Sequence, residues 1–393
     1  MPEQKSPAIK NRLHMPADLV EEILFRLPMK SVVRFSTVSK SWNSMIFGSS
    51  FVKRFRGRKR VVWRPQGFDN FSDALICPLS SISSPLQYHN PFDGATPLVC
   101  PFKGRSSLLA SCDELWCVEV ETSLVLWNHS LRTYRKLPVA SIPPWWGYHG
   151  FPYFSYGLGY DSVGNDYKIL KIDYRREAEA EVVAEAELYS LRSDSWRMIQ
   201  PFPRKNMSKS ASFVSGKLHW LVGGGSKLNS LIISFDLSTE KYGEVALPEF
   251  DGGDNYTLDT TILRGMLSVY VNDRNNGSFV LWVMEDYESD KSWTKELDIN
   301  YGHILPRAFS SYWNPLRPFN FYDEDGGGGG DQNLNKVVVI SFIDTSIIYT
   351  NTYDSTLLRR NVCDTSKSYV KFIDSFIYVE SLVSPDIWPR LRN

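Results

Sequence analysis

The sequence predicts an α+β multidomain protein, in which a small three-helix head precedes an all-β body that forms an irregular six-bladed β-propeller. Three observations predict this architecture. Apolar residues follow a helical period only near the start of the chain, between residues 15 and 47. After residue 60, short apolar runs alternate with clusters of Gly, Pro, Asn, Asp and Ser, which is typical of antiparallel strands. An aromatic motif then recurs at intervals of roughly 50 residues, a period typical of propeller blades.

The first helix of the head is predicted to begin at Pro16, because proline's fixed φ angle suits a first helical position. Asp18 follows in the first turn, where a negative charge interacts favourably with the helix dipole. The apolar residues recur on one broad face of this helix: Leu19, Val20, Ile23, Leu24 and Leu27. Pro28 ends the helix, because the residue before a proline avoids α geometry. Two further short apolar helices are expected around residues 32–35 and 42–46.

So much apolar side chain on so short a segment has two interpretations. A segment of about 40 residues rarely buries enough apolar surface to be stable alone. The helices therefore form either a surface for a partner or a helical hairpin that docks onto the rest of the chain. The hydrophobic pattern alone does not decide between the two.

The head also resembles an F-box, and this resemblance favours the partner surface. The matching positions are Met15-Pro16, Leu19-Val20, Ile23-Leu24, Leu27-Pro28, Lys30-Ser31, Val32-Val33, Arg34-Phe35, Val38-Ser39-Lys40 and Trp42. Met15 and Ser39 replace the Leu and Cys that are usual in the family. The resemblance implies binding to the Skp adaptor, and through it to the cullin and RING subunits of Skp–cullin–F-box ubiquitin ligases. The residues expected to contact the adaptor are Pro16, Leu19, Ile23, Leu24, Leu27, Pro28, Val32, Val33, Phe35, Lys40 and Trp42.

These patterns predict four regions, with the head and the body as independent units. The regions are a flexible tail at 1–11, the F-box at 12–52, a basic linker at 53–60 and the β domain at 61–393. The linker holds six Lys or Arg residues. Charge runs are usually solvated, so a linker is favoured over a nuclear import signal or a contact with an acidic partner.

The body is predicted from seven apolar runs, each flanked by turn residues: 61–63, 124–127, 167–172, 217–222, 231–235, 279–283 and 337–342. In the recurring motif an aromatic ends a strand, a polar turn follows, and a second aromatic begins the next strand. Four pairs fit it: Trp127 with Tyr134, Tyr189 with Trp196, Phe235 with Tyr242, and Trp282 with Trp293 after a longer turn. Aromatics that face each other across a hairpin bury a large area and fix its register.

Six blades follow from this motif. Five are predicted at 105–138, 155–200, 210–248, 258–300 and 310–362. The sixth combines strands from 61–100 with the last apolar run at 372–383, which closes the ring and removes the sheet edges. A pair of packed β-sheets is the alternative.

The body resembles the F-box-associated domain of a large plant family, most closely the group of the S-locus F-box proteins and defence-related F-box proteins. The matching segments are 50–55, 124–138, 157–172, 187–199, 280–297 and 377–385. Two positions depart from the family pattern and affect local turns. Asp113-Glu114 stand where Asn-Gly is usual, and His129 stands where proline normally follows Trp-Asn.

Composition excludes several classes of function. Lys+Arg 44 against Asp+Glu 44 gives no net charge, which argues against binding nucleic acid or a membrane surface. No apolar run is long enough to span a bilayer, and the first eleven residues lack the apolar core of a signal peptide. We therefore expect a soluble protein of the cytoplasm and/or nucleus, with its five cysteines reduced. No catalytic motif is present, and Cys112 and Cys117 lack partners for zinc, so we expect no cofactor and no metal.

The sequence thus predicts a non-catalytic receptor that brings a protein target to a ubiquitin ligase. The aromatic tract at 143–157 is the candidate target site, through Trp145, Trp146, Tyr148 and Tyr153. The alternative for this tract is a loop that caps the body. Two other functions stay open: a propeller scaffold or sugar-binding protein with a decayed F-box, and an enzyme with a site at the propeller axis.

Overall fold

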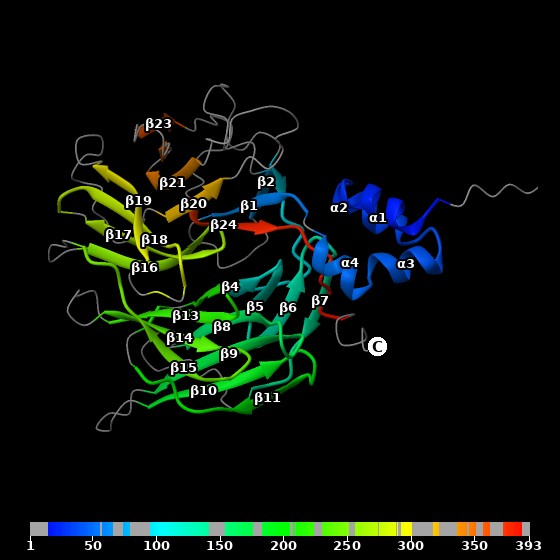
Figure 1. The fold of residues 1–393 in the computed structure, drawn as a ribbon, viewed down its shortest axis with the longest axis horizontal. Helices are drawn as coiled ribbons and strands as arrows, with labels where there is room; N and C mark the ends of the chain where they lie inside the picture. The colour runs from blue at the N-terminus through cyan, green and yellow to red at the C-terminus, as the bar shows by residue number, and fades with distance from the viewer. Residues whose placement is uncertain are drawn as a thin grey trace, which may run out of the picture.

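The structure is a computed structural model of the 393-residue chain. Figure 1 shows four helices gathered on one side of a larger body of strands. The residues that the structure describes are 15–55, 57–65, 74–78, 95–140, 154–175, 183–204, 207–208, 210–223, 230–250, 256–273, 275–287, 289, 292–300, 317–321, 336–343, 346–350, 357–361 and 372–386. No described helix is long and apolar enough to cross a bilayer.

The head contains one helix more than predicted. Its helices are α1 (Ala17–Phe25), α2 (Met29–Phe35), α3 (Lys40–Ile46) and α4 (Ser49–Arg54). Helix α4 spans the end of the predicted F-box and the start of the predicted linker. Its six residues are too few to show a helical period in the sequence. The three predicted helices are confirmed, and the fourth was missed.

The boundaries of the helices follow from proline and serine. Pro16 and Pro28 are the N-caps of α1 and α2, one position before the first helical residue. Ser39 is the N-cap of α3, and its Oγ accepts the Trp42 amide N–H at 3.1 Å. Serine in place of the family's usual cysteine thus gives α3 a side-chain cap, which typically contributes about 1 kcal/mol.

The body contains six four-stranded antiparallel sheets among the described residues. Five run in chain order: β4 (Ser106–Cys112) to β7 (Thr133–Lys136), β8 (Phe154–Asp161) to β11 (Ser195–Met198), β12 (Ser212–Val214) to β15 (Tyr242–Val245), β16 (Tyr256–Leu263) to β19 (Trp293–Asn300), and β20 (Arg317–Phe321) to β23 (Leu357–Asn361). The strands between them are β5 (Leu115–Val120), β6 (Ser123–Asn128), β9 (Asp166–Arg175), β10 (Val183–Ser190), β13 (Lys217–Val222), β14 (Leu231–Asp236), β17 (Met266–Asp273), β18 (Ser278–Met284), β21 (Lys336–Ile343) and β22 (Ser346–Thr350). Each sheet occupies one predicted blade, so the propeller and its blades are confirmed.

The sixth sheet joins the two ends of the chain. Its order is β24 (Phe372–Val379), β1 (Lys59–Pro65), β2 (Leu75–Pro78) and β3 (Thr96–Pro97). Strand β24 pairs with β1 from Lys59↔Val379 to Pro65↔Phe372. The last strand therefore takes the first place in the sheet that contains the first strand, and the predicted closure is confirmed. A closed ring leaves no blade without a neighbour.

Three of the four predicted aromatic pairs face each other across a hairpin. They are Trp127↔Tyr134, Tyr189↔Trp196 and Phe235↔Tyr242. The fourth prediction was wrong, because Trp282 faces Lys295 and Trp293 faces Met284. The partner of Trp293 lies two residues beyond Trp282 on β18, so the two rings are two positions out of register. The two strands pair up to Met284↔Trp293, and spacing in the sequence does not reveal where so long a connection begins and ends.

The Asp113-Glu114 turn keeps the hairpin geometry that Asn-Gly gives in the family. Both residues have positive φ angles, 47° and 69°. Two consecutive left-handed residues are the requirement of a type I′ hairpin turn. Strands β4 and β5 pair up to Cys112↔Leu115 on either side of it. The departure in sequence therefore leaves the fold of this turn unchanged.

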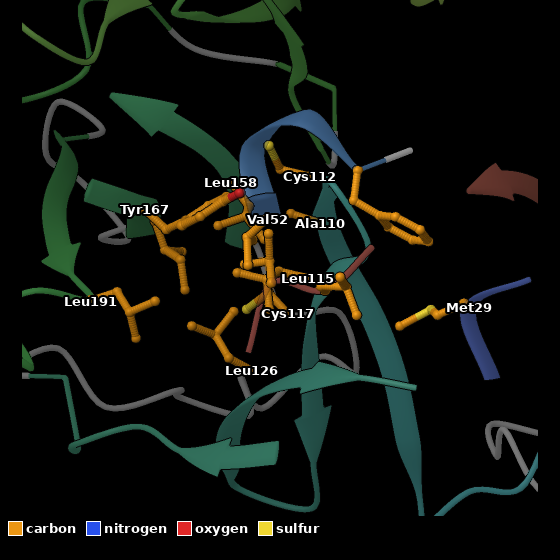
Figure 2. Packing of buried hydrophobic residues seen from close by; sticks show 14 of the residues in the cluster. Met29, Val52, Ala110, Cys112, Leu115, Cys117, Leu126, Leu158, Tyr167 and Leu191 are labelled. Atoms are coloured by element: carbon orange, nitrogen blue, oxygen red, sulfur yellow. The ribbon is translucent and has the colours of Figure 1, made fainter. Parts of the chain in front are cut away.

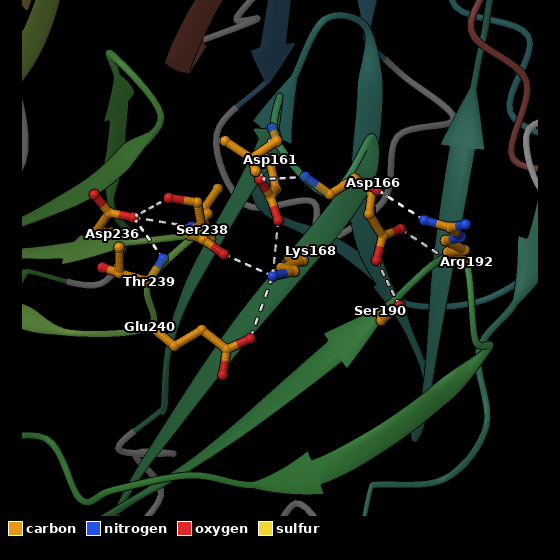
Figure 3. A network of polar contacts seen from close by, with 12 residues as sticks. Asp161, Asp166, Lys168, Ser190, Arg192, Asp236, Ser238, Thr239 and Glu240 are labelled. Atoms are coloured by element: carbon orange, nitrogen blue, oxygen red, sulfur yellow. Dashed lines mark hydrogen bonds and ion pairs between the residues drawn. The ribbon is translucent and has the colours of Figure 1, made fainter.

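Polar contacts tie neighbouring blades together as well. The Lys168 ammonium lies 3.0 Å from Asp161 Oδ2, 3.2 Å from Glu240 Oε1 and 2.6 Å from the Leu237 carbonyl oxygen. Figure 3 shows these contacts converging on Lys168 from the blade of β8–β11 and the blade of β12–β15. A buried ammonium is tolerated only where such partners satisfy it. The two blades are thereby held in one relative position.

Head and body share one hydrophobic core, which overturns the expectation that they are independent units. From the head it contains Leu24, Met29, Val32, Ile46, Phe51, Val52 and Phe55. From the body it contains residues of β4–β6 and β8–β10, together with Leu382 and Val383. Figure 2 shows Met29 and Val52 of the head beside Leu115 and Leu158 of the body.

The predicted basic linker is largely structured. Lys53 and Arg54 belong to α4, and Lys59 and Arg60 belong to β1. Gly57 lies between them and donates its N–H to the Glu380 carbonyl oxygen at 2.8 Å. Lys53, Arg54 and Arg58 are exposed and Lys59 and Arg60 are half-buried, whereas Phe55 is buried. A run of charges therefore marked an outward-facing surface and not a flexible segment.

One buried histidine predicts that the body loses stability in mild acid. His219 is fully buried, with Nδ1 3.1 Å from the Ser212 carbonyl oxygen and Nε2 2.5 Å from the Tyr287 hydroxyl. The carbonyl can only accept, so Nδ1 carries the proton and Nε2 accepts from Tyr287. Burial, with a smaller effect of Lys217, lowers the pKa of His219 from 6.5 to about 4.

The unfolded chain therefore binds a proton at His219 at a pH where the folded chain does not. Stability is full above pH 6.5 and falls as the pH drops towards 4, by about 1.4 kcal/mol per pKa unit for this group. Urea unfolding at pH 7 and pH 5 measures the loss. In His219→Gln, which cannot titrate, the difference between the two pH values is expected to shrink. An unchanged difference would contradict the assignment of this loss to His219.

Candidate functional site

Exposed apolar side chains gather on the head. Met15, Leu19, Ile23, Phe35 and Val38 are 37–63% exposed, although all five are large and apolar. Five of the eleven exposed large apolar residues in the described part of the chain fall within these 24 residues, and such a concentration on a soluble protein indicates an interaction site. We call these five residues the apolar patch.

Helix α1 has two apolar faces, and only one belongs to the patch. Leu19 and Ile23 lie one turn apart on the exposed face. Leu24 is 1% exposed and belongs to the core shared with the propeller. Leu27 is half-buried and packs against the same core. The helix thus both anchors the head and presents a surface.

The predicted adaptor contacts divide in the same way. Six are exposed: Pro16, Leu19, Ile23, Pro28, Phe35 and Lys40. Three are half-buried: Leu27, Val33 and Trp42. Leu24 and Val32 are buried in the shared core, so we assign them to the packing of the head and correct their prediction as surface contacts. The F-box pattern marks apolar positions without telling which side of the helix meets the body.

Prediction from the sequence left two members of the patch out of the site. Met15 and Val38 are 52% and 63% exposed. Both occupy positions of the F-box pattern, so the signal was present. Their exposure could not be predicted, because it depends on how the helices pack.

The patch is built on a rigid frame. The rings of Phe35 and Trp42 lie 5.5 Å apart and join α2 to α3. The Arg54 guanidinium lies 4.6 Å from the Phe25 ring centre and 3.3 Å from Glu21, which joins α4 to α1. Exposed charges of both signs lie between the apolar residues along the chain: Asp18, Glu22, Arg26, Lys30, Arg34 and Lys40. An apolar centre with polar residues beside it is the usual composition of a protein–protein interface.

The predicted target contacts Trp145, Trp146, Tyr148 and Tyr153 lie outside the described residues. The strands on either side of them are described. Leu137, directly after β7, and Tyr156 of β8 are buried in the shared core.

The described residues contain no group of three or more His, Cys, Asp or Glu side chains that could hold a metal ion. Two buried charged side chains of the body lie beside each other. Lys171 and Glu187 are 1% and 0% exposed, with their charged atoms 3.8 Å apart. Cys112 and Cys117 are both buried in the shared core, and burial raises the pKa of the Cys117 thiol to about 12. That thiol is therefore a packed apolar group and not a nucleophile at neutral pH.

Comparison with known families decides the identity of both parts. Residues 13–54 match the F-box domain. Residues 93–385, most of the chain, match the F-box associated beta propeller domain. The chain belongs to the F-box proteins with an associated β-propeller domain. The apolar patch lies within the F-box, and the six-bladed ring contains the associated domain.

Curated relatives in Arabidopsis thaliana agree. An F-box/kelch-repeat protein is 28% identical over 303 residues, and the aligned region covers 73% of this chain and 79% of the relative. The F-box protein CPR1 is 27% identical over 380 residues, covering 90% and 86%. A putative F-box protein is 28% identical over 335 residues, covering 79% and 74%. Among solved structures, a dipeptidyl peptidase 4 from Porphyromonas gingivalis aligns with 7% identity and a TM-score of 0.35 over 67% of this chain and 40% of that chain, too weak to support an inference.

An F-box indicates binding to the Skp adaptor in Skp–cullin–F-box complexes. The F-box, the propeller and the F-box relatives together support a general role as a substrate receptor rather than a catalyst.

Proposed function

We propose that this chain is the substrate-recognition subunit of a Skp–cullin–F-box E3 ubiquitin ligase. The single observation that carries the proposal is the apolar patch within the F-box, at a site where a solitary protein would expose polar residues. The patch docks the adaptor, the adaptor brings the cullin and RING subunits, and the propeller holds a protein target for ubiquitination and degradation. The protein works in the cytoplasm and/or the nucleus.

In this proposal the chain has no catalytic residue of its own. Its contribution to the rate is proximity, because holding a target beside the ubiquitin donor converts a bimolecular step into an effectively unimolecular one. The chain therefore needs an adaptor surface, a target surface and a defined geometry between them.

Co-expression with a plant Skp adaptor tests the proposal. The two proteins are expected to co-elute as a stable complex, and addition of cullin and RING subunits is expected to give ubiquitin transfer. A chain that stays free of the adaptor would instead support the alternative, a scaffold or sugar-binding propeller with a decayed F-box.

The proposed target contacts are Trp145, Trp146, Tyr148 and Tyr153, which lie between β7 and β8 along the chain. Replacing Trp145 and Trp146 by alanine is expected to weaken target capture, because Trp is enriched at the centres of interfaces. Adaptor binding and melting temperature are expected to stay at wild-type values. A variant that fails to fold would support the capping role of this tract instead.

The target itself is best found with the full-length chain. Removing the head would uncover Leu115, Leu158 and the rest of the shared core. A full-length variant that cannot bind the adaptor, such as Ile23→Arg, keeps that core covered. Affinity capture with this variant while the proteasome is blocked is expected to retain the target that the wild type releases for degradation.

A further inference from the structure

Helix α4 (Ser49–Arg54) connects the head to the propeller through both of its sides. Phe51 stacks on Phe25 of α1, with ring centres 4.5 Å apart, and on Phe55, with ring centres 6.0 Å apart. Val52 is 3% exposed. Figure 2 shows it among Ala110 and Leu158 of the body. The helix is therefore packed into both the head and the propeller.

Gly57 and Arg58, which directly precede β1, are too well paired with Glu380 to act as a hinge. The N–H of Gly57 donates to the Glu380 carbonyl oxygen at 2.8 Å, and the Glu380 N–H donates to the Arg58 carbonyl oxygen at 3.1 Å. Arg60 Nε lies 2.9 Å from Glu380 Oε1. A Cβ atom on Gly57 would lie 2.4 Å from the Glu380 Cβ, so only glycine allows this approach of the two backbones.

The C-terminal segment after β24 forms the rest of the surface on which the head packs. Leu382 and Val383 are buried in the shared core. Asn128 is fully buried, and its Nδ2 donates to the carbonyl oxygens of Ser381 and Val383 at 2.9 and 2.8 Å. Glu114, whose side chain is also fully buried, accepts the Ser381 amide N–H. The segment is thus fixed to the blade of β4–β7, and the head rests on it.

We propose that Val52, Phe55 and Gly57 are positioning residues that hold the adaptor-binding patch in one fixed orientation relative to the propeller. The consequence for ubiquitin transfer rests on the proposed function. None of the three belongs to the apolar patch. They act by fixing the geometry between the adaptor and the target, and transfer depends steeply on such geometry.

The distance between head and body tests the proposal on the chain alone. Spin labels are attached at Ser44→Cys in α3 and Ser162→Cys in the β8–β9 turn, both exposed positions. Cys100 and Cys363 are replaced by serine, and the buried Cys77, Cys112 and Cys117 are out of reach of the reagent. Double electron–electron resonance is expected to give a single narrow distance distribution. A broad or multiple distribution in the otherwise wild-type chain would overturn the proposal.

Two kinds of variant weaken the packing between the head and the propeller. Val52→Ala with Phe55→Ala removes two side chains from this packing, and Gly57→Ala forces the backbone at residue 57 away from the backbone at Glu380. Both are expected to broaden the distance distribution. The matched control is Phe279→Ala with Val283→Ala, which removes the same side-chain types from fully buried sites in β18, away from the head. It is expected to lower the melting temperature and to leave the distribution narrow. Equal broadening in the control would contradict the positioning role.

The lysines of the chain that receive ubiquitin in the reconstituted ligase give a readout that stability alone does not move. The wild type and the β18 control are expected to be modified at the same restricted set of lysines. The Val52→Ala/Phe55→Ala variant is expected to spread the modification over additional lysines while still binding the adaptor. An unchanged set in that variant would overturn the proposed link to transfer. Failure of the wild type to bind the adaptor would refute the proposed function, whereas the distance measurement would still decide whether the head is fixed.

Discussion

Replacing Ile23 by arginine is expected to abolish co-purification of the chain with the Skp adaptor. Ile23 is 49% exposed in the free chain and belongs to the apolar patch. A charge in a desolvated interface costs several kcal/mol, and a loss of ~2–4 kcal/mol already weakens binding by ~30- to 1000-fold. The melting temperature is expected to stay unchanged, because the side chain points away from the shared core.

A matched control shows whether the effect is local. Val163→Arg places the same charge at an 82% exposed apolar position on the propeller, and it is expected to leave adaptor binding intact. Leu27→Arg is a poorer test, because Leu27 packs against the shared core and the change would lower stability as well. Wild-type amounts of adaptor bound to Ile23→Arg would contradict the assignment of the patch.

Ending the chain after residue 371 is expected to disable the body and the head together. The truncation removes β24 and leaves β1 with an unpaired edge, which invites aggregation. It also removes Tyr378, Leu382 and Val383, which are all buried. Burying one such side chain contributes about 1.5–3 kcal/mol, against a net stability of ~5–15 kcal/mol for a typical domain.

Size-exclusion chromatography and an adaptor pull-down measure the two consequences of this truncation. The shortened chain is expected to elute as aggregate and to lose adaptor binding, because the head has lost part of the surface on which it packs. A chain that ends after Asp386 keeps every described contact of this segment and is expected to behave as wild type. A truncated chain that is monomeric, melts as wild type and binds the adaptor would show that neither the ring nor the head depends on the last strand.

Much of the propeller could be predicted because its signals are local. Strand alternation and the aromatic pairs, such as Phe235 with Tyr242, are set by neighbours in one hairpin. The closing contact between β24 and β1 was predicted from a simple requirement, since an apolar strand at the end of the chain needs a partner. At the longer connection between β18 and β19, where spacing does not fix the register, the predicted pairing of Trp282 with Trp293 was wrong.

The relation between head and body could not be predicted from the same signals. A helical period shows that Leu24 and Val32 are buried, but not whether an adaptor or the propeller covers them. The motif of the F-box has the same ambiguity. Helix α4 was missed because six residues show no period, although Phe51 and Val52 are the link between the two parts. Long-range packing, unlike pairing within a hairpin, leaves little trace in residue spacing.

The central claim is that the adaptor docks on the apolar patch of a head that is fixed to a closed propeller. Hydrogen–deuterium exchange of the full-length chain, with and without a Skp adaptor, tests it most directly. We expect added protection in peptides that cover α1 to α3, residues 15–46, and unchanged exchange in the blades of β12–β15 and β16–β19. Binding that protects the blades and leaves residues 15–46 unchanged, or no binding at all, would contradict the claim.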